Sequence, residues 1–173
     1  MKISCYGIVL LCALLSLAVS PAGAQEKTAK TDVDFPYTLG AAMELNMFTR
    51  EGSSFGYGAA LDRYIIPGYI LGGLRGVLSV SGDAINTTEA EVYLRLNMAK
   101  IDVPIIGGYV FSQFAWGFTS LREETNTLYT FSLNYTLGYR AFFLGGFYVE
   151  PYVRAGYPVR MAAGVSAGHW FNF

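Results

Sequence analysis

Long runs of this chain alternate strictly between apolar side chains and small or polar ones. The clearest run is residues 129–139, where Tyr, Phe and Leu alternate with Thr, Ser, Asn and Gly. Residues 37–49 and 89–99 follow the same period of two. Successive side chains of a β-strand point to opposite faces, whereas a period of two would scatter apolar residues around a helix. The pattern therefore predicts β-strands with one apolar face.

Eight strands are predicted in all, and ten would still fit with tighter connections. The connections alternate between compact turns, at 66–68, 100–104 and 140–145, and mostly more polar ones, at 50–53, 82–88, 116–126 and 157–160. Such short connections suit an antiparallel up-and-down sheet. The register of residues 105–115 stays open, because Tyr109 and Phe111 compete with Val110 and Phe114 for one face. The predicted strands are 37–49, 54–65, 69–81, 89–99, 105–115, 129–139, 146–156 and 161–173.

The composition narrows the class of protein. Of the 173 residues, 53% are hydrophobic and only 14% are charged, with a net charge of −1. So many apolar residues exclude a disordered chain, and the charge balance offers no basic surface for nucleic acid. Low charge with high hydrophobicity indicates a membrane protein.

The first 24 residues have the pattern of a secretory signal. Lys2 precedes an apolar run at 8–19, and Ala22-Gly23-Ala24 is an A-x-A cleavage site. The run is shorter than the roughly 20 residues that a spanning helix needs. We predict a signal peptide at 1–24, a flexible leader at 25–35 and one barrel domain at 36–173. Because Cys5 and Cys12 leave with the signal, disulfides and thiolate chemistry are excluded from the mature chain.

The two faces of the strands favour a barrel in lipid. One face carries Leu, Val, Met, Phe and Tyr, and the other carries Gly, Ser, Thr, Asn and a few charges. An open sheet edge in lipid would leave unpaired backbone groups at several kcal/mol each, so the sheet must close. An eight-stranded barrel has an interior wide enough only for side chains or one small ligand. We expect aromatic girdles at the strand ends, from Tyr37, Phe55, Tyr57, Tyr64, Tyr69, Tyr109, Trp116, Tyr129, Tyr139, Phe147, Tyr157, Phe171 and Phe173.

Seven charged residues fall on the small and polar face of the predicted strands. An isolated charge in a narrow interior is costly, so we expect these residues to pair in a network that fills the lumen. A gated ion path or a ligand cavity is the functional alternative. Arg63 has the opposite face and is expected at the membrane interface, within reach of lipid phosphate. The predicted lumen network is Glu44, Asp62, Arg75, Glu91, Arg95, Glu150 and Arg154.

The last strand carries the most specific signal. Its alternate residues include His169 and Phe171 and end at the aromatic Phe173. This resembles the C-terminal assembly signature of bacterial outer-membrane β-barrels, and residues 147–153 (FYVEPYV) look like a strand common in such families. The chain as a whole resembles the small OmpA/OmpX-like or opacity-type eight-stranded barrels. The resemblance implies an outer-membrane location, contact with outer-membrane lipid, and recognition by periplasmic chaperones and the assembly machinery.

Some barrels of this scaffold are enzymes that modify lipid A, and such chemistry needs a nucleophile activated by a base. His169 is the only histidine, Ser166 falls on the opposite face, and Phe171 occupies the position where a barrel deacylase has its serine. One His and no Cys in the mature chain make a poor metal set. We therefore expect no catalytic, cofactor or metal site.

The sequence thus predicts a monomeric, non-enzymatic outer-membrane β-barrel with a structural, adhesive or surface-interaction role. The first alternative is a narrow pore or a carrier of small hydrophobic molecules. The second is a soluble periplasmic barrel, similar to lipocalins, with an apolar ligand inside.

Overall fold

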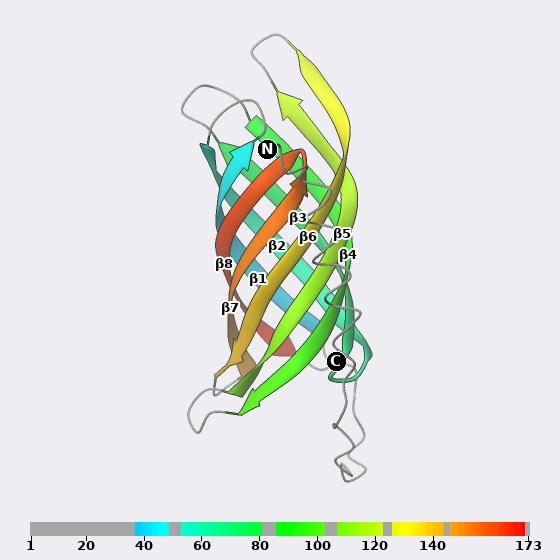
Figure 1. The fold of residues 1–173 in the computed structure, drawn as a ribbon, viewed down its shortest axis with the longest axis vertical. Helices are drawn as coiled ribbons and strands as arrows, with labels where there is room; N and C mark the ends of the chain where they lie inside the picture. The colour runs from blue at the N-terminus through cyan, green and yellow to red at the C-terminus, as the bar shows by residue number, and fades with distance from the viewer. Residues whose placement is uncertain are drawn as a thin grey trace, which may run out of the picture.

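We describe the protein from a computed structural model, which places residues 37–48, 53–80, 86–102, 107–122, 126–143 and 146–171. The predicted signal peptide, the leader and Phe173 lie outside these residues. Eight antiparallel strands form one closed barrel in which each strand pairs with the next and β8 pairs with β1 (Figure 1). They are β1 (Tyr37–Phe48), β2 (Ser53–Ile66), β3 (Ile70–Val80), β4 (Asn86–Asp102), β5 (Gly107–Arg122), β6 (Thr127–Phe142), β7 (Phe147–Tyr157) and β8 (Val159–Phe171).

The polarity of the barrel is inverted relative to a water-soluble protein. Charged and polar side chains fill the interior, where Glu44, Asp62 and Arg154 are at most 3% exposed. The outer face presents large apolar side chains, such as Leu74 at 58% and Met43 at 51% exposure. A surface of this kind is stable only against hydrocarbon, so the chain folds as a transmembrane antiparallel β-barrel. In the part of the chain that the structure describes, no helix has the length and apolar character to cross a membrane.

The prediction of eight strands is confirmed, but four of them, β2, β4, β5 and β6, are longer than expected. The segment 116–126 was predicted as a loop, whereas β5 continues to Arg122 and β6 begins at Thr127. These two strands form a hairpin that projects at the top of the barrel in Figure 1. Bilayer thickness limits only the part of a strand that meets lipid, and hydrogen bonding between two strands continues beyond it.

One edge of this hairpin has no neighbouring strand among the described residues. The pairing of β6 with β7 begins at Leu133 and Tyr157, so residues 127–132 pair with β5 alone. Unpaired backbone groups are not tolerated in hydrocarbon. The level of Leu133 and Tyr157 therefore marks the upper limit of the hydrocarbon at this seam.

The structure settles the open register of β5. A β-bulge between Asn97 and Ala99 of β4 shifts the pairing, and Phe111 lies inside at 1% exposure. Phe114 lies outside at 39% exposure. The sequence pattern was ambiguous here because β5 carries large aromatic residues on both of its faces.

Two residues of the predicted girdles were placed wrongly. Tyr64 is buried inside the barrel, and Tyr109 lines a pocket at one end. Both stand near strand ends, as a girdle residue would, but the register turns them inward. On the outer face, Tyr37 and Phe171 stack with ring centroids 6.4 Å apart, which joins β1 to β8.

Large interior rings lie over glycines of the neighbouring strand. Tyr93 is the cross-strand partner of Gly73, and a Cβ atom on Gly73 would come within 2.5 Å of its ring. Three further partner pairs have the same geometry, so each of these four rings occupies the space left by the missing side chain of its partner. They are Phe111 with Gly138, Tyr152 with Gly164, and Tyr148 with Gly168.

Candidate functional site: a lumen filled by two ionic clusters

All seven predicted charges point into the lumen, and two more charged residues join them there. We call the end where β1 begins and β8 ends the terminal mouth, and the other end the distal mouth. The charges form a terminal cluster of Asp62, Arg95, Arg140 and Glu150 and a distal cluster of Glu44, Arg75, Glu89, Glu91 and Arg154.

The terminal cluster is centred on Glu150. This carboxylate accepts a hydrogen bond from Arg95 Nη1 at 2.5 Å and another from Arg140 Nε. Arg140 Nη2 also lies 3.2 Å from Asp62 Oδ2. With two acids and two guanidiniums, the formal charge of this cluster is zero.

Neutral side chains complete the terminal cluster. Tyr93 donates to Asp62 Oδ2 at 2.7 Å, and Thr38 donates to the other oxygen of that carboxylate. Gln113 accepts from Arg95 at 2.9 and 3.0 Å. The Arg95 guanidinium lies 4.0 Å from the ring centroid of Phe111, so one face of this cation packs on an aromatic ring.

The distal cluster is built around Arg154, which is fully buried. Its Nη1 donates to Glu89 Oε2 at 2.7 Å, and its Nη2 pairs with Glu44. Glu91 lies farther away, with Oε1 at 4.0 Å from Arg154 Nη1. Three acids and two guanidiniums give this cluster a formal charge of −1.

The contact between Arg75 and Glu91 is poorly aligned. Their nearest atoms, Nη2 and Oε2, are 3.2 Å apart, yet neither makes a hydrogen bond to any described residue. Attraction between the two charges remains, but the donor does not point at the acceptor. The distal cluster is therefore both less neutral and less well bonded than the terminal one.

The two clusters leave almost no free space between them. A cavity of about 30 Å³ lies where residues of both clusters meet, among them Arg75, Arg95 and Glu150. One water molecule needs about 10–15 Å³, so the cavity has space for two or three waters at most. Between the two clusters, the described residues leave too little space for a substrate.

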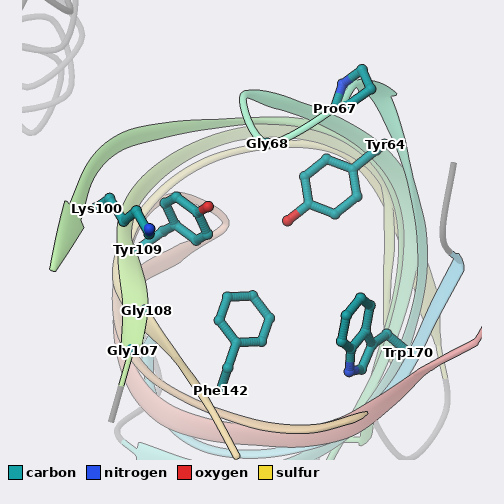
Figure 2. Close-up of a pocket in the computed structure, with 9 residues that line it drawn as sticks. All are labelled: Tyr64, Pro67, Gly68, Lys100, Gly107, Gly108, Tyr109, Phe142 and Trp170. Carbon is teal, nitrogen blue, oxygen red and sulfur yellow. The ribbon is translucent and has the colours of Figure 1, made fainter. Parts of the chain in front are cut away.

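A larger pocket opens at the terminal mouth. Its volume is about 360 Å³, and its lining is mostly apolar. Figure 2 shows the rings of Tyr64, Tyr109, Phe142 and Trp170 arranged around this opening, with Lys100 at its side. Tyr64, Leu71 and Arg95 lie in one row of strand partners, so this pocket, which we call the vestibule, is next to the terminal cluster.

Sequence reasoning missed Glu89 and Arg140. Arg140 had been assigned to a turn at 140–145, whereas β6 continues to Phe142 and directs Arg140 inward. Glu89 was the first residue of its predicted strand, at an end where a charge is expected to be solvated, but β4 begins at Asn86. Both residues continue the inward alternation of their own strand, because Glu89 lies two positions before Glu91 and Arg140 lies two positions after Gly138.

His169 and Phe171, the two residues of the C-terminal signature that the structure describes, lie on the outer face. His169 packs edge-on against Phe147 with ring centroids 4.9 Å apart, and Phe171 stacks on Tyr37. Ser166 is buried inside the barrel, so the wall of the sheet separates it from His169. Among the residues that the structure places, no cluster of three or more His, Cys, Asp or Glu residues is suited to hold a metal ion.

Known structures share this architecture at low sequence identity. No protein-family model and no curated protein matches the chain. The N-terminal β-barrel domain of Pseudomonas aeruginosa OprF matches with 13% identity and a TM-score of 0.53, over 79% of this chain and 97% of that one. Neisserial surface protein A (NspA) matches with 12% identity and a TM-score of 0.55, over 81% and 97%. The resemblance to small outer-membrane barrels is thus confirmed for the fold.

Proposed function

We propose that this protein is a non-conducting, non-enzymatic barrel of the bacterial outer membrane that presents its β5–β6 hairpin at the cell surface. The filled lumen carries this proposal. Among the residues that the structure places, nine buried charged side chains occupy the interior, and the cavity where their two clusters meet is about 30 Å³. A hydrated ion or a solute has no path through such an interior.

The hairpin supports a surface-interaction role. Its outward side chains Phe118 and Tyr129 are 68% and 76% exposed, and Phe131 packs edge-on against Phe118. The backbone edge at 127–132 is unpaired among the described residues, and such an edge can accept an extended strand of a partner. Aromatic side chains beside a free edge offer both contact area and backbone hydrogen bonds.

Planar-bilayer recording tests the closed lumen. The purified wild-type barrel should give no stable single-channel steps in KCl, because the ionic clusters block the passage. A general diffusion porin, inserted in the same bilayer system, controls for successful incorporation. Reproducible conductance steps that scale with the amount of inserted barrel would overturn the proposal in favour of a narrow pore.

Cysteine labelling tests the location and the orientation. The only native cysteines are Cys5 and Cys12, which precede the predicted cleavage site. Asn126→Cys at the hairpin tip should react with a membrane-impermeant maleimide on intact cells. Pro67→Cys at the terminal mouth should react only after permeabilisation. Labelling of both variants after mild osmotic release, without detergent, would instead indicate a soluble periplasmic protein.

The vestibule at the terminal mouth favours a second candidate, which is binding of a small hydrophobic molecule. Its volume of about 360 Å³ lies within the range of small-molecule sites. The fluorescent probe 1-anilinonaphthalene-8-sulfonate should bind wild type with a single saturable phase that Trp170→Ala removes. An identical titration of wild type and Trp170→Ala would exclude the vestibule as the binding site.

A further inference from the structure

Away from the distal rim, where β5 ends at Arg122, the described part of the outer face carries one charged side chain. Arg63 is exposed and points outward, whereas the other outward positions of the described strands are apolar, small or uncharged up to that rim. Its guanidinium lies 4.9 Å from the centroid of the Tyr37 ring. Stacking uses the face of the guanidinium, and its N–H donors lie around the edge in a fork that fits a phosphate.

A surface depression begins at this arginine. It has a volume of about 460 Å³ and is lined by Tyr37, Arg63, Gly72, Leu94 and Trp116, with the exposed Leu61, Leu74 and Val92 along one side. The floor is low because Gly72 has no side chain. Apart from Arg63, the outward lining is apolar or aromatic, which suits a hydrocarbon chain.

The strand register gives the direction of the depression. Arg63 pairs with Tyr37 on β1, and on its other side the row of partners runs to Gly72 and Leu94. Followed around the barrel, the same row returns to β1 at Met47, ten residues (47 minus 37) beyond Tyr37 toward the distal mouth. The full row is Arg63, Gly72, Leu94, Phe114, Tyr135, Ala155, Met161 and Met47.

The row therefore climbs from the terminal mouth toward the middle of the membrane. Tyr37 is the first residue of β1, so Arg63 stands at headgroup level at the terminal mouth. From there the depression crosses Gly72 and rises beside Leu94 into the hydrocarbon. The cation at the interface complements the phosphate of a phospholipid, and the apolar depression that leads inward complements an acyl chain.

We propose that this depression binds one phospholipid of the leaflet at the terminal mouth, with its phosphate on Arg63 and an acyl chain across Gly72. Charge complementarity favours a lipid over a second copy of the chain. The described outer face between the two rims presents no carboxylate that a second barrel would bring to Arg63. A phospholipid supplies both the anionic group and the apolar chain.

The proposal is tested by native mass spectrometry of the full barrel in mild detergent with added phosphatidylglycerol. Wild type should retain one lipid. The Arg63→Gln variant should retain at least about tenfold less lipid than wild type, because a charge-assisted contact with the phosphate is lost. Arg122→Gln removes an outward arginine at the distal rim and should retain the lipid like wild type. A heat-modifiable band on gels verifies that each variant is folded.

A second pair of variants tests the path of the acyl chain. Gly72→Leu fills the floor of the depression, where a Cβ atom meets only flexible side-chain ends of Ile65 and Leu94, and should also reduce retention. Gly76→Leu lies on the same strand outside this depression, where a Cβ atom meets one carbonyl oxygen at 3.8 Å, and should not. Equal retention by wild type and Arg63→Gln would overturn the proposal. So would a dimer without lipid that Arg63→Gln dissociates.

Discussion

The two ionic clusters of the lumen differ in how completely their buried charges are neutralised and hydrogen-bonded. In the terminal cluster, two acids face two guanidiniums, and Glu150 accepts hydrogen bonds from both Arg95 and Arg140. In the distal cluster, three acids share two guanidiniums, and the Arg75–Glu91 pair is misaligned. Burying a charge costs several kcal/mol unless partners replace its water. The charges of the terminal cluster are therefore matched, whereas the distal cluster depends on one residue, Arg154.

The largest expected effect comes from removing that residue. Arg154→Met leaves Glu44, Glu89 and Glu91 with Arg75 alone, and should lower the free energy of unfolding by about 4–5 kcal/mol. Arg140→Met leaves Asp62 and Glu150 with Arg95 and should cost about 3 kcal/mol. Urea unfolding in detergent micelles, followed by tryptophan fluorescence, measures both values.

Arg122→Met controls for the loss of an arginine at an exposed position, and it should change stability by no more than about 0.5 kcal/mol. If Arg140→Met proves more destabilising than Arg154→Met, the distal cluster does not depend on one residue and the comparison fails. Should Arg154→Met not refold while Arg140→Met does, the expected order still holds.

Much of the fold followed from the alternation of side chains. The period of two predicted eight strands, and it placed Glu44, Arg95 and Glu150 on the same side of their strands. This works because a β-strand has only two faces and lipid accepts only one kind of side chain. Strand ends were predicted less well, as at 116–126, because hairpin pairing does not stop where the membrane does.

The partners within the lumen could not be predicted from the alternation. Arg154 meets Glu44 across 110 positions of the sequence, and the meeting depends on barrel closure and shear, which no local pattern encodes. The fit of Tyr93 over Gly73 has the same origin, since it requires the register between β3 and β4. Tyr64 and Tyr109 were misplaced for a related reason: proximity to a strand end indicates height in the membrane but not the face.

A smaller difference in stability is expected between variants of one acid from each cluster. Glu150→Gln removes the charge that both Arg95 and Arg140 face, and should destabilise by about 3 kcal/mol because two buried guanidiniums then share one acid, Asp62. Glu91→Gln should cost less than about 1 kcal/mol. It removes the excess negative charge of the distal cluster, and Glu91 Oε2 makes no hydrogen bond among the described residues that could be lost.

The same urea titration compares these two variants with wild type, and each amide keeps the size of the side chain it replaces. Glu91 Oε1 still accepts from Asn134 in the wild-type barrel, and a glutamine retains an oxygen for that bond. The difference between the variants therefore reports charge matching rather than packing. A Glu91→Gln barrel as unstable as Glu150→Gln would mean that Arg75 relies on Glu91 despite their poor alignment, and the two clusters would then be equally matched.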